Sequence, residues 1–407
     1  MVGGSEGVTL ILSDFEITVE KMVYGGDGLG RLDGRAVLVP FVLPGERVRA
    51  EATAEKPGWL RARVVQTEVA ARERITAPCP YFMRCGGCHY QHAPYELQLA
   101  WKRGILEDQL RRIGKTAPPA EIAVVSGEPW GYRNRIQLHI AGTNLGYRAA
   151  QSHRLQPIET CPIASPALNR AITCLREMLH DARWPRFLRS IELFTNETDL
   201  QLKVLETERP VAARFFEWCA ERVPGWVPGT LDYGAFRVSR GSFFQVNRFL
   251  IERLVETALD GATGDTALDL FAGVGLFSLP LAGRFAAVTA VEAGARAAAD
   301  LRFNAERAGV TVGIENAPAE AFLETVTSPP DFVLLDPPRA GIGKRMVEQL
   351  ARLRVRQLML AGCDPATLAR DLAGLLAAGY RIARMTLVDL FPQTYHLETV
   401  VALDRRD

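Results

Sequence analysis

The sequence lacks a long apolar stretch. No run of about 18 apolar residues occurs in its 407 residues, and the most apolar segment, 368–380, is interrupted by Arg370 and Asp371. A membrane-spanning helix is therefore not expected. The first ten residues also lack the basic and apolar segments of a secretory signal. We expect a cytoplasmic protein that does not enter the membrane.

An excess of charge of one sign is absent as well. The 48 Lys and Arg residues balance 47 Asp and Glu residues, and the net charge is +1. A nucleic-acid-binding surface must therefore be local. Charge alone does not separate such a surface from a solvated helix face. The candidate basic residues for RNA contact are Lys102, Arg103, Arg111, Arg112 and Lys115, together with Arg133, Arg135, Arg148 and Arg154.

Cysteine is scarce and odd in number. The chain has seven cysteines, which argues against a disulfide framework. Three of them, Cys79, Cys85 and Cys88, lie within ten residues, and Cys161, which precedes a proline, is a candidate fourth ligand. Four thiolates suit either an iron–sulfur cluster or a structural zinc ion. The residue types alone do not decide between these two metals.

The chain is too long for one compact domain, and its patterns change along its length. Four short alternating segments predict a small, OB-like β-barrel within 12–69, with the glycine-rich run 25–30 as a turn. Barrels of this size often bind oligonucleotides. Mixed helix and strand patterns predict a central α+β domain over 70–235, which contains the clustered cysteines.

From residue 236 onward, strand patterns alternate with helices rich in alanine and leucine. This alternation predicts an α/β domain over 236–407, with a doubly wound, Rossmann-like parallel sheet. Ligands of such sheets bind at the carboxyl ends of the strands, where the strand order reverses. Candidate functional residues are therefore expected at strand ends.

A glycine turn follows the first predicted strand of this sheet, in the sequence Asp-Leu-Phe-Ala-Gly-Val-Gly at 269–275. Gly273 and Gly275 allow the backbone to turn tightly beside a nucleotide. Glu292 ends the next predicted strand, where a carboxylate can accept hydrogen bonds from ribose hydroxyls. The spacing differs from the six-residue dinucleotide fingerprint and fits S-adenosylmethionine better than NAD.

Three further strand ends carry rigid or reactive groups. Asp336 precedes two prolines and Arg339, so it lies in a stiff loop. Cys363 precedes a helix predicted to begin at Pro365, and we expect the positive end of that helix to favour the thiolate. Glu398 is flanked by apolar residues, and we expect burial to raise its pKa toward that of a useful general base.

In chain order, these motifs resemble the bacterial RNA uridine-5-methyltransferases, specifically the iron–sulfur branch that acts on 23S rRNA. The resemblance covers nearly the whole chain and implies an N-terminal TRAM barrel, a central [4Fe–4S] domain and a C-terminal methyltransferase domain. It rests on the four cysteines, Ser-Phe-Phe-Gln-Val-Asn at 242–247, the turn at 269–275, Asp-Pro-Pro-Arg at 336–339, Gly-Cys-Asp-Pro at 362–365 and His-Leu-Glu-Thr at 396–399.

The resemblance also implies roles for individual residues. Cys363 is implied as the nucleophile that attacks carbon 6 of the target uracil, and Glu398 as the base that removes the carbon 5 proton. One departure is Leu276, where many relatives carry an asparagine that touches the cofactor. The residues implied to bind S-adenosylmethionine are Gln245, Phe271, Gly273, Glu292, Asn316 and Asp336, and those implied to hold the cluster are Cys79, Cys85, Cys88 and Cys161.

Two other interpretations are open. Amino-methyltransferases that act on adenine or cytosine also use a Pro-Pro loop, but they usually carry an aromatic residue where Arg339 stands, and they need no Cys363 and Glu398 pair. An iron–sulfur RNA-binding protein with a degenerate transferase domain is opposed by the intact Cys363, Glu398 and Asp336. The expected partner is RNA, with 23S rRNA favoured over tRNA, and no obligate protein partner is implied.

Overall fold

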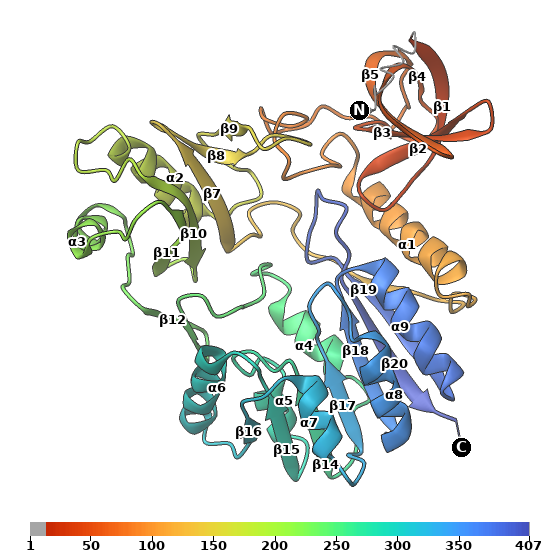
Figure 1. Ribbon diagram of the computed structural model, residues 1–407, viewed down its shortest axis with the longest axis vertical. Coiled ribbons are helices and arrows are strands. Elements are labelled where there is room, and N and C mark those ends of the chain that lie inside the picture. Colours follow the sequence, from red (N-terminus) through yellow and green to blue (C-terminus); the bar gives the residue numbers. More distant parts are fainter. Residues whose placement is uncertain (1–13, 407) are drawn as a thin grey trace, which may run out of the picture. The chain divides into compact units, whose positions relative to one another are not determined.

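The computed structural model describes residues 14–406, which form two compact units (Figure 1). The first unit comprises residues 14–83, 88–101 and 393–395, and the second comprises 84–87, 102–392 and 396–406. The sequence predicted three domains, with boundaries after residues 69 and 235. That division is still a prediction, because the two units of the structure are divided differently. The first ten residues, and positions 12, 13 and 407 of the predicted domains, lie outside the described residues.

A closed β-barrel dominates the first unit, in the strand order β1, β2, β3, β5, β4. Its strands are β1 (Phe15–Met22), β2 (Asp27–Leu32), β3 (Arg35–Pro40), β4 (Arg47–Lys56) and β5 (Trp59–Val69). The barrel is confirmed, and the glycine run does supply the turn between β1 and β2, where Gly25 and Gly26 have positive φ angles, but the turn ends before β2 begins at Asp27. A Cβ at Gly28 would lie 2.5 Å from Val42 and 2.8 Å from Val19. Glycine is thus needed for close strand packing, a need that local sequence cannot reveal.

An antiparallel sheet with two helices forms one part of the second unit, as the α+β pattern predicted. Helix α1 (Tyr95–Arg112), which has residues in both units, precedes it. In the described residues the sheet order is β11, β10, β7, β8, β9. The elements are β7 (Arg135–Ala141), β8 (Asn144–Arg148), β9 (Leu155–Pro157), α2 (Pro166–Met178), β10 (Leu188–Thr195), β11 (Leu200–Thr207) and α3 (Ala213–Arg222), followed by a hairpin of β12 (Thr230–Tyr233) and β13 (Phe236–Ser239).

A larger sheet completes the second unit, with the order β16, β15, β14, β17, β18, β20, β19, β6 within residues 14–406. Its strands are β6 (Ala123–Val125), β14 (Thr266–Leu270), β15 (Ala287–Val291), β16 (Gly313–Glu315), β17 (Phe332–Leu335), β18 (Gln357–Gly362), β19 (Tyr380–Val388) and β20 (Thr399–Arg405). The first five strands in this order are parallel, as predicted. The antiparallel β20 and the distant edge strand β6 were not expected.

Helices pack along this sheet (Figure 1), with α5 against α6, α7 against α8, and α8 against α9. They are α4 (Ile251–Leu259), α5 (Ser278–Ala282), α6 (Ala295–Ala308), α7 (Ala319–Thr325), α8 (Gly343–Leu353) and α9 (Pro365–Ala377). Strand order reverses at β14, which lies between β15 and β17. The predicted switch point is therefore present. No helix in the described part of the chain is both long and apolar enough to cross a membrane.

Candidate active site at the carboxyl edge of the large sheet

The parallel strands end level with one another, which places their following residues at one edge. Leu270 of β14 pairs with Val291 of β15 and with Leu335 of β17, and Leu335 pairs with Leu360 of β18. Each of these strands is directly followed by a predicted site residue. These residues are Phe271, Glu292, Asp336 and Cys363.

The antiparallel strand β20 brings the predicted base to the predicted nucleophile. Thr399, the first residue of β20, pairs with Gly362, the last residue of β18. Cys363 follows β18 and Glu398 precedes β20, so the two residues lie at the same end of neighbouring strands. The charge of Glu398 acts on the Cys363 thiol. Residues 35 positions apart in the chain are thus joined by tertiary pairing alone.

The glycine turn and Glu292 are held together by hydrogen bonds. Phe271 and Gly273 both have positive φ angles, of 65° and 57°. Glu292 accepts hydrogen bonds from the main-chain N–H of Gly273 at 2.8 Å and of Gly294 at 2.6 Å. Asn316 Nδ2 donates to the Glu292 carbonyl oxygen at 2.8 Å. Four predicted cofactor residues therefore form one connected arrangement.

A cavity of 270 Å³ lies beside Glu292 in the second unit. Its lining is mostly apolar and includes Glu292, whose carboxylate is a hydrogen-bond acceptor. The lining residues are Phe271, Val291, Glu292, Ala293, Pro318, Ala319, Glu320, Gly341, Ile342 and Met346.

Carboxyl groups gather behind the turn without a basic partner. Gln245 Nε2 donates to Asp336 Oδ2 at 3.3 Å, and burial raises the pKa of Asp336 to about 6. Burial, opposed by the hydrogen bond from Ser278, raises the pKa of the fully buried Asp269 to about 7, and the charges of Asp336 and Glu292 also raise it. Among residues 14–406, neither Asp269 nor Asp336 forms an ion pair with Lys, Arg or His. Such an acidic edge complements a cationic ligand.

Glu398 behaves as the sequence predicts. Its side chain is buried, and its Oε1 atom has no hydrogen-bond partner among the described residues. Burial, and then the nearby Asp336, raise the pKa of Glu398 well above its ordinary value. A carboxylate with a raised pKa is a stronger base once it is ionised.

The expectation that helix α9 favours a Cys363 thiolate was wrong. Burial first, and then the charge of Glu398, raise the pKa of the Cys363 thiol to about 12, while Arg339 lowers it. At the start of the helix, Asp364 Oδ1 accepts hydrogen bonds from the N–H groups of Ala366 and Thr367, both at 3.0 Å. The positive helix end is therefore compensated by the Asp364 carboxylate instead of the thiol.

Two of the basic residues expected to contact RNA form buried ion pairs instead. Lys102 Nζ lies 2.6 Å from Asp389 Oδ1, and both side chains are 0% exposed. The same ammonium donates to the carbonyl oxygen of Phe391 at 2.9 Å, so it tethers the loop that leads to Glu398. Arg135 pairs with Glu192 at 3.1 Å, and each side chain is 11% exposed. The prediction for Lys102 and Arg135 was wrong, because sequence does not distinguish a solvated cation from a paired, buried one.

The four predicted metal ligands are divided between the units. Cys79 and Cys88 belong to the first unit, and Cys85 and Cys161 belong to the second. Among residues 14–406, no three His, Cys, Asp or Glu side chains are arranged to hold one metal ion, and none of the seven cysteines forms a disulfide. Within the second unit, burial and then the Cys161 and Cys85 thiols raise the pKa of Tyr147 well above its ordinary value. The two thiols thus approach one phenol.

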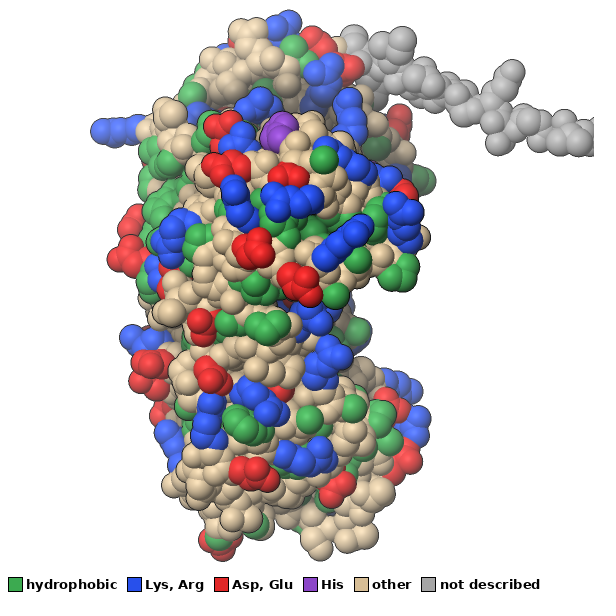
Figure 2. All heavy atoms as spheres, turned by 90° about the vertical axis from the view of Figure 1, so that its left-hand side faces the viewer, with side chains coloured by type: hydrophobic (Ala, Val, Ile, Leu, Met, Phe, Trp, Pro, Cys, Tyr) green, Lys and Arg blue, Asp and Glu red, His purple; other side chains and the backbone are tan. Residues whose placement is uncertain are grey.

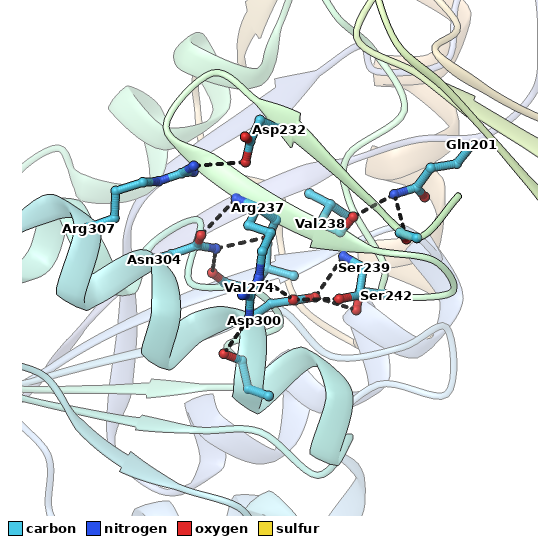
Figure 3. A network of polar contacts seen from close by, with 12 residues as sticks. Gln201, Asp232, Arg237, Val238, Ser239, Ser242, Val274, Asp300, Asn304 and Arg307 are labelled. Carbon is cyan, nitrogen blue, oxygen red and sulfur yellow. Dashed lines mark hydrogen bonds and ion pairs between the residues drawn. The ribbon is translucent and has the colours of Figure 1, made fainter. Parts of the chain in front are cut away.

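A buried polar network on helix α6 escaped the sequence analysis (Figure 3). Asp300, which is 0% exposed, accepts hydrogen bonds from the hydroxyls of Ser239 at 2.7 Å and Ser242 at 2.8 Å. Asn304, one turn later, donates to the Val274 carbonyl oxygen at 3.0 Å. The network therefore connects the segment before Gln245 to the glycine turn. Helical spacing of Asp300 and Asn304 beside buried apolar residues was the available signal.

Comparisons with known proteins agree with this arrangement. A family model described as tRNA (Uracil-5-)-methyltransferase matches residues 328–406, and a TRAM domain model matches residues 12–65. The solved structure of a Pyrococcus abyssi tRNA (uracil-54, C5)-methyltransferase in complex with S-adenosyl-L-homocysteine has a TM-score of 0.75 and 25% identity, over 95% of this chain and 100% of that one. The fold is therefore of the methyltransferase class.

Full-length relatives narrow this class to a family. A 23S rRNA (uracil(1939)-C(5))-methyltransferase from Chromohalobacter salexigens is 35% identical, over 96% of this chain and 89% of the relative. A protein named as an uncharacterized RNA methyltransferase from Streptomyces avermitilis is also 35% identical, over 96% of this chain and 98% of the relative. The chain belongs to the RNA uracil-C5 methyltransferase family, as its motifs indicated.

Proposed function

We propose that this protein transfers a methyl group from S-adenosylmethionine to carbon 5 of a uridine in RNA, with 23S rRNA as the favoured substrate. The observation that carries the proposal is the pairing of β18 with β20, which sets Cys363 beside Glu398 at the acidic edge of the sheet. The named rRNA-specific relatives support 23S rRNA, and the structurally similar tRNA enzyme makes tRNA the second candidate.

The residues at the sheet edge fit S-adenosylmethionine. The apolar cavity beside Glu292 suits an adenine ring, and the carboxyl groups near Asp336 suit a positively charged sulfonium. When bound, this cosubstrate supplies an electrophilic methyl group. Leu276 is buried against the core and offers no polar contact in place of the asparagine of relatives. The residues that would hold the cosubstrate are Gln245, Phe271, Gly273, Glu292, Asn316 and Asp336.

Cys363 would act as a covalent catalyst. Carbon 5 of uracil is a weak nucleophile, but a thiolate that adds to carbon 6 forms an S–C6 bond and converts the ring into an enolate that is nucleophilic at carbon 5. The thiol loses its proton to solvent before this bond forms. Arg339 lowers the pKa of Cys363 and so favours that loss, against burial and the charge of Glu398.

Glu398 would complete the cycle. After carbon 5 gains the methyl group, the Glu398 carboxylate takes the carbon 5 proton. The electron pair of that C–H bond restores the C5–C6 double bond, and the S–C6 bond breaks to release the Cys363 thiolate. The base has to be ionised for this step, and its raised pKa then makes it a strong proton acceptor.

We propose in addition that the barrel binds the RNA backbone and that the four cysteines hold a [4Fe–4S] cluster. The donor set fits such a cluster in its chemistry, because Cys79, Cys85, Cys88 and Cys161 are all thiols outside disulfides. Protein purified without oxygen should contain about four iron and four sulfide per chain. Stoichiometric zinc without iron or sulfide would instead assign a structural zinc site.

The activity is tested by mapping 5-methyluridine in RNA. The full-length protein is incubated with S-adenosylmethionine in two separate reactions. One reaction contains 23S rRNA and the other contains tRNA, and both RNAs lack the modification. We expect one modified uridine in 23S rRNA. Modification of tRNA alone would assign tRNA as the substrate instead of 23S rRNA. Methylated adenine or cytosine would support the amino-methyltransferase alternative. RNA binding without methyl transfer to any base would support the degenerate-domain alternative.

A further inference from the structure

We propose that Lys203, Arg240 and Arg296 bind a phosphate of the RNA backbone beside the active site. These three residues are called the Gly241 cluster below, because Lys203 and Arg296 flank that glycine and Arg240 precedes it. The proposal rests on the proposed function, since it assumes that RNA is the substrate.

Lys203 and Arg296 come from separate elements and meet at Gly241 in the second unit, whereas the Arg240 guanidinium lies 5.8 Å from the centroid of the Phe216 ring. Lys203 lies on β11, Arg240 follows β13, and Arg296 lies in the first turn of α6. A Cβ atom at Gly241 would lie 3.0 Å from Lys203 Nζ and 3.6 Å from Arg296 Nη1. Arg296 Nη1 also donates to the main-chain oxygen of Arg240 at 2.6 Å. Two cationic heads therefore flank Gly241, and a third basic side chain begins at the preceding residue.

The positive charge of the Gly241 cluster is not compensated. Within residues 14–406, no carboxylate lies within 4 Å of the charged atoms of Lys203, Arg240 or Arg296. The nearest acids along these elements have other partners. Glu192, which is opposite Lys203 in the strand register, pairs with Arg135. Asp300, one turn after Arg296 on α6, pairs with Arg237 and both serines.

Glu292 lies just before α6, and its two oxygens accept hydrogen bonds from Gly273 and Gly294. Like charges brought together without a counter-charge repel one another, so their convergence costs free energy in the absence of an anion. A bound phosphate would make the electrostatic free energy of the cluster favourable, and it would accept hydrogen bonds from lysine and arginine side chains.

The polar network on α6 (Figure 3) orders the backbone on both sides of Arg240 and Gly241. Asp300 binds Ser239 and Ser242, the residues on either side of the Arg240–Gly241 pair. Gly241 itself has a φ angle of +95°, which disfavours other residues. The backbone that carries Arg240 is therefore set before a ligand arrives, which lowers the entropic cost of binding.

The position of the cluster favours RNA over a free anion. Gly241 begins a short segment that continues through Phe243, which is 61% exposed, to Gln245, which bonds Asp336 at the active site. The segment that carries Arg240 therefore leads directly to a proposed cosubstrate-binding residue. Figure 2 shows basic and acidic side chains mixed over one face of the molecule. On a surface of mixed charge, a local group of uncompensated cations is a specific site for a backbone phosphate.

The test measures RNA affinity of the full-length protein against salt. A Lys203→Gln/Arg240→Gln/Arg296→Gln variant should bind RNA about tenfold or more weakly near 0.1 M salt, and the slope of log K against log salt should fall by about 0.7 for each phosphate that the variant no longer binds. Affinity for S-adenosylmethionine should stay unchanged, which also reports that the second unit is folded. The matched control is Arg302→Gln, because Arg302 is an exposed arginine on the same helix without a carboxylate partner in the described residues.

If the triple variant does not fold, the single Lys203→Gln and Arg296→Gln variants give the same test. Lys203→Arg should bind RNA more tightly than Lys203→Gln, because it keeps the positive charge. Unchanged RNA affinity and salt slope, in variants that bind S-adenosylmethionine normally, would overturn the phosphate site while uridine methylation by the wild type still stands. If the wild type methylates no uridine but the variants still lose RNA affinity, the phosphate site stands and the proposed activity falls.

Discussion

The two halves of the active-site edge differ in how far their polar groups are satisfied. Beside β14 and β15, Glu292 and Asn316 form hydrogen bonds to the main chain around the glycine turn, and the exception is Asp269, which has one unpaired oxygen. Beside β18 and β20, Glu398 is buried with an unpaired oxygen, and Cys363 has a raised pKa. Paired groups form a binding site before the ligand arrives, whereas buried, unpaired groups are destabilising until a substrate contacts them. The proposed cosubstrate half is therefore preorganised, and we expect the proposed catalytic half to depend on the RNA base.

Removal of the nucleophile is the strongest test of this comparison. Cys363→Ala should lower the methylation rate by a factor on the order of 10⁴ or more, because no covalent adduct can form. RNA that carries 5-fluorouridine should trap the wild type as a band stable in denaturing gels, and the variant should give none. S-adenosylmethionine affinity is the control and should be unchanged. Methylation at a comparable rate by the variant would remove the covalent mechanism.

Loss of the base should separate the two chemical steps. Glu398→Gln leaves thiolate addition and methyl transfer in place but removes the proton acceptor, so turnover should fall by about 10²–10⁴-fold. A methylated protein–RNA adduct should then accumulate with ordinary uridine, as measured on denaturing gels with a labelled methyl group. The absence of any adduct, together with full loss of activity, would place Glu398 in the addition step instead.

The buried Lys102–Asp389 pair should support only the catalytic half. Lys102→Met leaves the Asp389 carboxylate buried without its cation, which costs about 3–5 kcal/mol of stability. We also expect a lower kcat with little change in S-adenosylmethionine affinity, because the tethered loop leads to Glu398. Thermal unfolding and steady-state kinetics measure both effects. The matched Lys102→Met/Asp389→Leu variant should regain stability, and equal damage to cosubstrate binding would contradict the division.

The cosubstrate half should show the opposite selectivity. Glu292→Gln keeps the shape of the side chain but weakens acceptance from Gly273 and Gly294, so S-adenosylmethionine affinity should fall roughly tenfold, as expected for hydrogen bonds to a charged group. Affinity for RNA should not change. Calorimetric titration measures the first quantity, with Glu315→Gln, an exposed acid at the end of β16, as the control.

Asp269 tests the comparison through the pH dependence of stability. Its pKa is raised from 3.8 to about 7 in the folded protein, so the folded state binds more protons than the unfolded state between these values. The stability that Asp269 contributes is therefore complete below pH 3.8 and is lost as the pH rises through about 7. Asp269→Asn should flatten the decline of unfolding free energy with pH by at most about 1.4 kcal/mol per pH unit. Urea unfolding from pH 5 to 8 measures this, and identical slopes would show that Asp269 is ionised throughout.

Local sequence determined the elements and the residues at their ends. The glycine turn at 269–275, the two prolines after Asp336 and the alternation of strands and helices are short-range patterns, and they predicted the switch point and most of the parallel sheet. The family of the chain was also evident from these motifs, because each one combines a backbone requirement with a reactive side chain.

The tertiary structure alone decided which groups meet and what those meetings do to their charges. The antiparallel pairing of β18 with β20 places Cys363 beside Glu398. Lys102 is buried in an ion pair with Asp389 and does not contact RNA. Asp364, and not the Cys363 thiol, accepts the hydrogen bonds at the start of α9. Proximity, burial and pKa depend on residues distant in sequence, so no local pattern specifies them. A strand pattern defines which residues lie at its end, but the pairing of strands defines which ends lie together.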